Sequence, residues 1–538
     1  MQDTEYDYII VGAGSSGSVV ANRLSADPSV RVCLLEAGPS DRELITGFKS
    51  RLPIGSVWLL PSAKTNWSYF FKGGEKLANR DIPTHRGRMS GGSSSVNGMV
   101  YMRGHASDYD EWRDLGNAGW GWEDVLPIFK KQENRERGAN ALHGVGGELN
   151  VAELRTQNPV TRAFLDAAGE TQYPRNDDFN GERQDGFGPW DVTQKNGQRW
   201  NATRAFIHPV LQRKNLAVIN NCETLKVEID NKRATGVLIR HKGRQQTIKA
   251  RREVILCGGA YNSPKLLMLS GIGDAGALKQ HGISCVQHLP GVGRNLQDHP
   301  ASWIEFEDVS RESAALNLRT LPRYTLAVLQ YAFKRSGPLT TNAVEAGGFI
   351  RTDPKLSKPD IQYVFMPAIR APGQFMPSQH GFTLMAILLR PKSRGYMELA
   401  SADPAAKPVL HPNFLDDPAD TAAMVRGTQL GRQILAAPAL ARHRGREITP
   451  GDNVQSFDDI QAYIRRTIMT SYHPVGTCKM APASDPLGVV DARLRVRGVE
   501  NLRVIDSSIM PTIVGGNTNA PTMVIGEKGA GFVMEDAR

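Results

Sequence analysis

The feature that most constrains the fold of this chain is a glycine-rich turn close to its start. An apolar strand candidate leads into Gly12, Gly14 and Gly17, which have the spacing G-x-G-x-x-G, and a helix-like segment follows. A second apolar run then ends at Glu36. A strand, glycine turn and helix, then a strand ending in an acid, are typical of a βαβ unit that binds a dinucleotide.

Each part of this unit has a physical role. Gly12 permits the tight turn, Gly14 lets the backbone approach a pyrophosphate, and Gly17 lets the helix pack closely on the strand. The phosphates are expected at the helix N-terminus, where unpaired N–H groups point at them. Glu36 is expected to accept a hydrogen bond from a ribose hydroxyl, and its carboxylate disfavours the 2′-phosphate of NADP. The unit alone does not distinguish FAD from NAD.

Length and composition suggest two domains of an ordinary globular protein. A chain of 538 residues is too long for one simple core, and 40% hydrophobic with 22% charged residues is normal for globular proteins. No apolar run reaches about 18 residues, which argues against a transmembrane helix. The first residues show no basic and then apolar signal peptide, so a cytoplasmic protein is predicted.

The net charge of +10 does not indicate a nucleic-acid partner, because the basic residues are dispersed and no aromatic residues alternate with them. Peripheral attraction to an acidic membrane surface stays open, although no amphipathic segment supports it. The five cysteines are widely spread without a C-x-x-C pair, so neither a disulfide framework nor a metal site is predicted. The sequence does not indicate an oligomeric state.

A strand–turn–helix pattern recurs in the middle of the chain. Residues 253–259 predict a buried strand, and a helix is expected to begin with Ser263 as its N-cap and Pro264 in its first turn. Upstream, the alternating runs 216–219, 224–229 and 234–239 predict the strands of a meander.

The same pattern returns at the end of the chain. Residues 502–506 predict a buried strand that ends in an acid, and residues 514–523 lead into a helix. Two intervening stretches, about 160–210 and 300–465, are rich in proline and aromatic residues. The simplest architecture is one α/β nucleotide domain assembled from separated segments, with a second domain inserted between them.

Five long motifs, in order along the chain, resemble those of the glucose–methanol–choline (GMC) oxidoreductases, which are FAD enzymes that oxidise alcohols. The resemblance covers essentially the whole chain. The motifs are Gly91–Asn97 followed by Arg103 and Asp108–Asp110, then Gly259–Gly273, Gly293–His299, Tyr472–Met480 and Asn517–Met523.

The resemblance implies FAD rather than NAD, bound in a Rossmann-like domain of discontinuous segments. The inserted substrate domain is expected to contain an antiparallel sheet and flanking helices. The implied boundaries are 1–160, 211–300 and 466–538 for the FAD-binding domain, and 161–210 and 301–465 for the substrate domain.

Two positions near the first motif need separate comment. Val96 stands where some family members have a histidine covalently tied to the flavin, and because valine has no nucleophile, non-covalent FAD is predicted. Ser90 stands where a branched aliphatic residue is usual. It is expected to change packing near the flavin, and a polar contact is also open.

The resemblance implies the catalytic residues. Removing the proton of an alcohol while hydride leaves requires a base, and histidine is suitable because its pKa is near neutrality. His473 matches the family's catalytic histidine. Asn517 matches a position that is histidine or asparagine, where an amide donates a hydrogen bond to the developing alkoxide. The alternative role for Asn517 is that of a turn former.

The resemblance also implies a set of cofactor contacts. Val227 is expected to contact the adenine through its backbone, and Asp506 to contact the pyrophosphate or ribityl region or, alternatively, to cap a turn. The residues expected around the cofactor are Gly12, Gly14, Ser15, Ser16, Gly17, Glu36, Ala37, Arg88, Gly91, Gly92, Ser93, Asn97, Gly98, Met99, Val227, Gly258, Asp506, Asn517, Asn519 and Thr522.

The expected substrate pocket is largely apolar and has no acid to bind a quaternary ammonium group, which favours neutral primary alcohols, aliphatic or aryl, over choline. Ser471 is expected to widen it. Its predicted residues are Met99, Tyr101, Phe365, Met366, Ser471 and Tyr472.

The predicted reaction is oxidation of a primary alcohol to its aldehyde, with hydride transfer to flavin N5 and His473 as the general base. The electron acceptor is oxygen or a quinone-type carrier. Three alternatives remain: a hydroxynitrile lyase activity without redox change, a choline dehydrogenase-like specificity, and flavin binding without catalysis.

Overall fold

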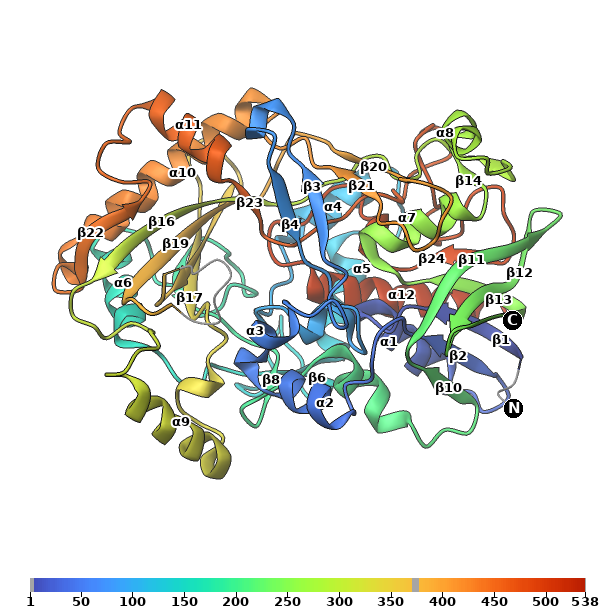
Figure 1. Ribbon diagram of the computed structural model, residues 1–538, viewed down its shortest axis with the longest axis horizontal. Coiled ribbons are helices and arrows are strands. Elements are labelled where there is room, and N and C mark those ends of the chain that lie inside the picture. Colours follow the sequence, from blue (N-terminus) through green and yellow to red (C-terminus); the bar gives the residue numbers. More distant parts are fainter. Residues whose placement is uncertain (1–3, 370–376, 538) are drawn as a thin grey trace.

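A computed structural model describes residues 4–369 and 377–537 of the chain. Two large sheets stand at either end of the molecule, and both termini lie beside the first sheet (Figure 1). No helix in the described part of the chain is long and apolar enough to cross a membrane. The predicted α/β class with a Rossmann-like unit is confirmed.

The first sheet is made from segments that are far apart in the sequence. Its strand order is β10-β2-β1-β13-β12-β11, and β24 pairs with β13. The neighbours of β1, on both of its sides, run parallel to it. The strands are β1 (Glu5–Val11), β2 (Val32–Leu35), β10 (Leu216–Ile219), β11 (Cys222–Asp230), β12 (Arg233–His241), β13 (Arg244–Leu256) and β24 (Leu502–Val504).

Strand β13 joins two kinds of pairing. Its first half is antiparallel to β12, and its second half is parallel to β1. The predicted meander is therefore β11–β12–β13. The prediction was wrong for residues 216–219, because β10 pairs in parallel with β2 at the opposite edge of the sheet.

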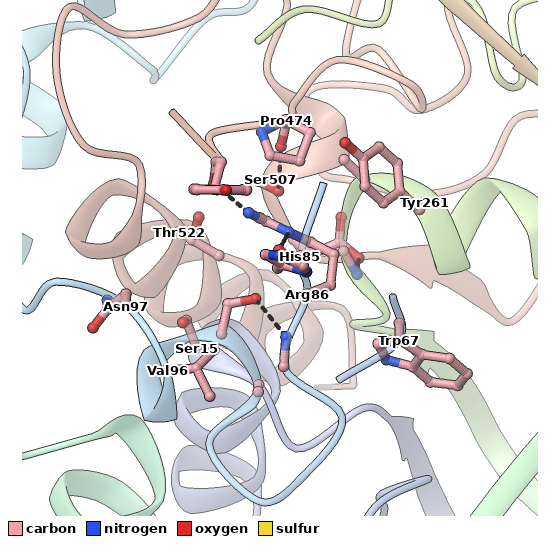
Figure 2. Close-up of a pocket in the computed structure, with 18 of the residues that line it drawn as sticks. Ser15, Trp67, His85, Arg86, Val96, Asn97, Tyr261, Pro474, Ser507 and Thr522 are labelled. Atoms are coloured by element: carbon pink, nitrogen blue, oxygen red, sulfur yellow. Dashed lines mark hydrogen bonds between the residues drawn. The ribbon is translucent and has the colours of Figure 1, made fainter. Parts of the chain in front are cut away.

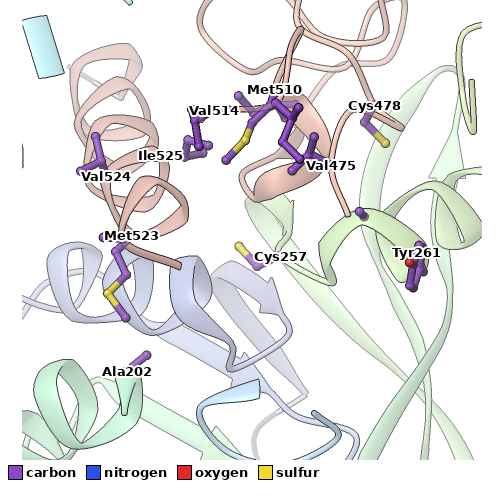
Figure 3. Packing of buried hydrophobic residues seen from close by; sticks show 14 of the residues in the cluster. Ala202, Cys257, Tyr261, Val475, Cys478, Met510, Val514, Met523, Val524 and Ile525 are labelled. Atoms are coloured by element: carbon purple, nitrogen blue, oxygen red, sulfur yellow. The ribbon is translucent and has the colours of Figure 1, made fainter. Parts of the chain in front are cut away.

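Helices α1 (Ser15–Leu24) and α12 (Asn519–Asp536) lie against each other beside this sheet (Figure 1). Figure 3 shows Met523, Val524 and Ile525 of α12 among the buried side chains of this region, with Cys257 at the end of β13 close by. This packing brings the first and last motifs of the chain to the same place.

Helix α7 (Gly259–Leu269) follows β13, and it begins earlier than predicted. Its N-cap is Gly258, and Pro264 lies inside the helix. Ser263 lies inside the helix and is therefore not its N-cap. Its hydroxyl instead accepts a hydrogen bond from the Gly258 N–H at 2.9 Å and donates one to the carboxylate of Asp506.

The second sheet is antiparallel, with the strand order β22-β16-β19-β18-β17-β7, and β23 pairs with β16. Helix α10 (Pro418–Ala436) packs against it, and α6 (Pro159–Glu170) and α11 (Phe457–Thr467) flank α10. The strands are β7 (Gly186–Pro189), β16 (Pro300–Asp308), β17 (Ala346–Ile350), β18 (Ile361–Met366), β19 (Gly381–Leu388), β22 (Arg444–Thr449) and β23 (Met469–Thr470).

Smaller elements fill the space between and around the two sheets. The predicted domain boundaries stay predictions, although residues 203–207 of the expected substrate domain pack against α1. The remaining strands and main helices are β3 (Tyr69–Lys72), β4 (Asp81–Thr84), β5 (Glu133–Arg135), β6 (Leu149–Val151), β8 (Gln194–Lys195), β9 (Gln198–Arg199), β14 (Ile272–Gly273), β15 (Gln287–His288), β20 (Tyr396–Glu398), β21 (Val409–His411), α2 (Leu44–Arg51), α3 (Ser56–Leu59), α4 (Ala106–Asp114), α5 (Trp122–Gln132), α8 (Ala275–Gln280) and α9 (Leu321–Lys334).

Candidate active site

The turn after β1 requires its glycines for two different reasons. Gly12 has φ +107°, and a Cβ atom there would lie 2.5 Å from the Cys257 carbonyl oxygen. A Cβ atom on Gly17 would lie 1.9 Å from the Gly12 carbonyl oxygen. A Cβ atom on Gly14 would meet no atom within 4 Å, so this residue faces open space. The first and third glycines permit the backbone geometry, and the second leaves room for a ligand.

Two helix N-termini open toward this space. Neither α1 nor α12 has a side-chain N-cap hydrogen bond or an acidic residue in its first turn. Ser15 of α1 donates a hydrogen bond to Asn519 of α12 at 2.7 Å, which holds the two helix starts together. Both helix dipoles therefore present partial positive charge to the same region, as the binding of a pyrophosphate requires.

Glu36 holds the glycine turn from the adjacent strand. Its carboxylate accepts hydrogen bonds from the Ala13 N–H at 3.1 Å and the Gly38 N–H at 2.9 Å. Burial raises its pKa, because a carboxylate removed from water is disfavoured. Glu36 also lines the cavity, where a ribose hydroxyl could share its oxygens.

One cavity of about 570 Å³ extends from this turn to His473. In Figure 2 the side chains of Ser15, Val96 and Asn97 lie on one side of it, and those of Trp67 and Tyr261 lie on the other. The predicted cofactor residues that line this cavity are Gly12, Gly14, Ser15, Ser16, Glu36, Ala37, Gly92, Ser93, Asn97, Gly98, Met99, Gly258, Asp506, Asn517, Asn519 and Thr522.

Four predicted cofactor residues lie outside the cavity wall. Gly17 serves the turn by close packing, and the guanidinium of Arg88 lies over the ring of Trp67 at 5.1 Å. Gly91 donates its N–H to the Ala13 carbonyl at 2.8 Å. The N–H of Val227 is already bonded to the Ser270 hydroxyl at 2.8 Å, so it has no free donor for an adenine.

The wall on the Val227 side is formed instead by the preceding residues of β11, Cys222, Glu223 and Thr224. Asp506 lines the cavity, and it accepts the Ser508 N–H at 2.8 Å as the cap of a short 3-10 helix; its contact with the pyrophosphate or ribityl region stays a prediction. Ser90 makes a polar contact, since its hydroxyl accepts a hydrogen bond from Asn220 at 2.7 Å.

At the other end of the cavity the structure brings His473 and Asn517 together. The Asn517 Nδ2 donates to His473 Nε2 at 3.0 Å, and the Asn517 carbonyl oxygen accepts a hydrogen bond from Gln362 of β18 at 3.3 Å. Gln362 thereby determines which way the Asn517 amide faces. The sequence reasoning did not include Gln362, because nothing local to 362 indicates that β18 crosses residue 517.

His299 determines which nitrogen of His473 carries the proton. His299 Nε2 lies 3.1 Å from the Leu389 carbonyl, which can only accept, so Nε2 carries the His299 proton. Burial lowers the pKa of His299 to about 3, so its Nδ1 is a bare acceptor. The His473 Nδ1 lies 3.0 Å away and must donate to it. His473 Nε2 is therefore unprotonated.

The backbone beneath this pair is anchored by Asp298. Its carboxylate accepts hydrogen bonds from the N–H groups of His299 and His473, both at 2.8 Å, and from the Thr470 hydroxyl. Burial raises the pKa of Asp298 to about 6 despite these donors. Burial, His299 and the cation of Arg86 lower the pKa of His473 well below the usual value, so the imidazole is neutral at neutral pH.

The second sheet covers the His473 end of the cavity with apolar side chains. Val364 and Met366 of β18 line it, as do Met385 and Ile387 of β19. The prediction of Phe365 was wrong, because side chains alternate along a strand and Phe365 faces away, stacked on Phe164 at 4.3 Å between ring centroids.

Tyr101 also lies outside the cavity, since its ring is fully buried and its hydroxyl accepts a hydrogen bond from Arg103 at 3.2 Å. The other predicted substrate residues, Met99, Met366, Ser471 and Tyr472, do line the cavity. The Ser471 hydroxyl is buried and has no hydrogen-bond partner among the residues that the structure describes, so it can donate to a ligand.

Several cavity residues were absent from the sequence prediction. His85 stacks on Tyr472 with 5.6 Å between ring centroids, and Arg86 donates to the Tyr472 carbonyl. Trp67 and Tyr261 complete the wall opposite the glycine turn. His85 and Arg86 lie just ahead of the first motif, in Thr84-His-Arg-Gly87, and that proximity was the one available signal.

The cavity fits an FAD-type dinucleotide. It joins a glycine turn with open space at Gly14, two uncapped helix N-termini, a ribose-accepting carboxylate and a compartment that ends at an unprotonated imidazole. In the described residues no group of three or more His, Cys, Asp or Glu side chains is arranged to hold a metal ion.

Known proteins match this chain over nearly its whole length. An alcohol dehydrogenase [acceptor] of Pseudomonas putida is 45% identical, covering 98% of this chain and 96% of the relative. An oxygen-dependent choline dehydrogenase of Sinorhizobium fredii is 42% identical, covering 98% and 95%. Among solved structures, pyridoxine 4-oxidase from Mesorbium loti has a TM-score of 0.87 at 30% identity, with 98% of each chain covered.

Formate oxidase of Aspergillus oryzae has a TM-score of 0.90 at 26% identity, and the match covers 100% of this chain and 99% of that one. The family described as GMC oxidoreductase matches residues 6–301 with its N-terminal part and residues 391–526 with its C-terminal part. These matches confirm the resemblance carried by the five motifs and the flavoprotein oxidoreductase that it implied. The chain belongs to the GMC oxidoreductase family.

Proposed function

We propose that this protein oxidises a neutral primary alcohol, aliphatic or aryl, to the aldehyde, with His473 as the general base. The observation that carries the proposal is the unprotonated Nε2 of His473, held in a buried compartment beside the Asn517 amide. In the reaction the alcohol O–H proton passes to Nε2. FAD, when bound, supplies the acceptor for the hydride that leaves the carbinol carbon.

Asn517 stabilises the charge that develops on the alcohol oxygen. Its amide has two N–H donors, of which one points at His473 Nε2 and the other is free for the substrate. Gln362 holds the amide carbonyl through a hydrogen bond, which keeps the NH2 group of the amide on the side of His473. A donor placed in advance at the site of developing charge favours the transition state over the ground state.

The residues that would hold FAD without a covalent bond are those of the long cavity. The glycine turn and the starts of α1 and α12 are suited to the pyrophosphate, and Glu36 to a ribose. Val96, at 8% exposure, lines the cavity where a covalent attachment would require a nucleophile. Asn97, Gly98 and Met99 continue the wall toward the substrate compartment.

The substrate compartment favours a neutral, apolar alcohol. Its lining from the second sheet is aliphatic and thioether, and the charged side chain that lines the cavity beside Tyr472 is that of Arg86. Among the described residues of the cavity wall the carboxylates are those of Glu36, which follows β2, Glu223 of β11, and Asp506, which follows β24 and is bonded to the Gly259 N–H and the Ser263 hydroxyl. A quaternary ammonium substrate would therefore meet repulsion without a compensating acid.

The names of the relatives support alcohol oxidation but differ in the alcohol that they specify. The protein from Pseudomonas putida is named for alcohols in general, and the one from Sinorhizobium fredii for choline. Asp298, whose carboxylate accepts the His473 N–H, is not among the residues that line the cavity, so it is not placed to bind a quaternary ammonium group, and this supports the first. A quinone-type or other carrier is the proposed electron acceptor; the name of the Pseudomonas putida relative specifies only an acceptor, and the name of the Sinorhizobium fredii relative specifies oxygen.

The test is anaerobic mixing of the FAD-loaded protein with benzyl alcohol, 1-hexanol or choline. The neutral alcohols should bleach the flavin, and choline should do so far more slowly. H473A should bleach about 10²–10⁴-fold more slowly with normal FAD content, because that is the usual contribution of a general base. H281A, at a half-buried histidine that does not line the cavity, is the matched control.

Two results would contradict the proposal. An unchanged rate of flavin bleaching in H473A would contradict the role of His473 as the base. Faster bleaching with choline than with either neutral alcohol would contradict the proposed substrate class. Aldehyde formation from a hydroxynitrile with the flavin still oxidised would indicate a lyase. Re-aeration with and without a quinone then distinguishes the two acceptors, since only reaction with oxygen yields hydrogen peroxide.

A further inference from the structure

Large apolar side chains are concentrated on one outer face of the molecule. Leu44, Ile45 and Phe48 of α2 and Leu326, Leu329 and Phe333 of α9 are all exposed, with exposures reaching 89% at Leu44 and 85% at Phe333. We call these six residues the α2–α9 face. Exposed apolar patches of this kind mark surfaces that meet another molecule or a membrane.

Helix α9 is apolar on both of its sides. Ala327 and Tyr331, four residues apart, are its buried residues and face the protein. Leu326, Leu329 and Phe333 have the i, i+3, i+7 spacing of a second stripe, on the side where a surface helix normally has polar residues. The helix therefore has one apolar set of residues toward the protein and a second toward the outside.

The two helices belong to one continuous surface. The 3-10 turn at Pro53–Gly55, which follows α2, contacts the 3-10 turn at Pro338–Thr340, which follows α9. Tyr331 of α9 lies within electrostatic range of Arg51 of α2. Both helices lie along the lower edge of the view in Figure 1.

Basic residues predominate around this face. Residues 44–64 contain Lys49, Arg51 and Lys64 and no acid, and residues 314–336 contain four basic residues and no acid, while the nearest acids are Glu43 and Glu312 just before these ranges. We propose that the α2–α9 face docks onto the surface of an anionic phospholipid bilayer. Apolar side chains enter the headgroup region while the surrounding lysine and arginine residues pair with lipid phosphates.

Docking in this orientation brings the substrate cavity to the membrane. Ser56 and Leu60, at the two ends of α3, line the cavity. Val344 lines it as well, shortly after α9 and its 3-10 turn. The docked elements are thus continuous with the cavity wall, which favours exchange of lipid-soluble reactants. The docking itself does not depend on the proposed reaction.

The test is flotation of the FAD-loaded protein with vesicles of phosphatidylglycerol and phosphatidylcholine in equal parts. The wild type should float with these vesicles and bind pure phosphatidylcholine at least tenfold more weakly, and high salt should release it. L326Q/L329Q/F333Q should reduce binding to the anionic vesicles at least tenfold. L115Q/V145Q/L487Q, at exposed apolar residues outside this face, should bind as the wild type does.

Flavin content and turnover of a water-soluble alcohol should stay normal in both triple variants, since the substituted side chains are exposed. Failure of the wild type to float, or equal flotation of both triple variants, would overturn the proposal. Sedimentation decides the competing case: a dimer that L326Q/L329Q/F333Q dissociates, without lipid binding, would show that a second copy covers this face. Flotation needs no catalysis, so its outcome is separate from that of the alcohol test.

Discussion

The proposed base, His473, depends on its neighbours for its tautomer, because an isolated histidine has no preference for either ring nitrogen that suits this reaction. The Leu389 carbonyl determines the proton position on His299, and His299 in turn determines it on His473. Three groups in series therefore leave Nε2 bare at the place where Asn517 donates. Burial contributes by keeping both rings neutral.

A pair of substitutions at His299 tests this relay. H299L removes the acceptor of the His473 Nδ1 proton. Because the proton can then move to Nε2, kcat/KM should fall roughly 10–100-fold, as it does when other orienting residues are lost. H299N retains an acceptor oxygen and should recover most of the rate. Anaerobic flavin reduction and FAD content are measured for both variants. Equal losses in H299L and H299N would show a packing role instead.

The pH dependence of the wild type follows from the depressed pKa of His473. A lowered pKa means that the neutral base persists to lower pH, so kcat/KM should stay constant through neutrality and decline only below the ordinary histidine value of about 6.5. Stopped-flow reduction of the bound flavin from pH 5 to 9 measures this. An acidic limb centred above 6.5 would contradict the assignment of the base to a buried imidazole.

At this scale, motifs pointed to the proposed catalytic residues but not to the contacts that orient them. His473 and Asn517 stand in recognisable motifs, whereas Gln362 stands in an ordinary strand. The contact of His299 with His473 joins residues 174 apart, and no local pattern encodes it. The wrong prediction of Phe365 as a pocket residue could have been avoided from local sequence. Only one face of a strand can line a cavity, and Met366, the next residue, lies on that face.

Among the elements, the β1–α1 turn shows how sequence specifies a site through backbone geometry. Its glycine spacing could be read directly, because Gly12 and Gly17 permit the backbone geometry of the turn and Gly14 leaves open space. Strand partners could not be read in this way. Residues 216–219 look like meander strands, yet β10 pairs with β2, because the choice of partner depends on the whole sheet. Helix α7 also begins earlier than the sequence predicts. Ser263 donates to Asp506, a tertiary contact that the sequence does not indicate, and it does not act as the predicted N-cap.

Two glycine-to-alanine substitutions separate steric need from helix propensity. G17A places a methyl group 1.9 Å from the Gly12 carbonyl oxygen, so the turn must open, and FAD content and thermal stability should both fall. G531A, in α12, meets no atom within 4 Å and should stabilise by about 0.5–1 kcal/mol. Thermal midpoints and bound flavin per chain measure both effects. A G17A protein with full FAD content and unchanged stability would contradict the turn geometry.

The cavity lies between the first sheet, whose central strands are parallel, and the second sheet, which is antiparallel. The glycine turn and helix starts come from the first sheet, and the aliphatic lining near His473 comes from the second. The chain passes between these regions several times, so neither wall is made by one continuous segment. A ligand that extends from one end of the cavity to the other therefore contacts both parts of the fold.

This arrangement makes FAD a stabilising ligand. With valine at position 96 the cofactor has no covalent tie there, so acid precipitation should release all flavin from the polypeptide. After mild removal of FAD, the thermal midpoint should rise with each addition, because a ligand at 100 times its Kd stabilises the folded state by about 2.7 kcal/mol. FMN, which lacks the adenylate half, should give a smaller shift, since the glycine turn and Glu36 would remain without a partner. Flavin that precipitates with the chain, or a midpoint indifferent to FAD, would mean that the two ends of the cavity are not joined by this cofactor.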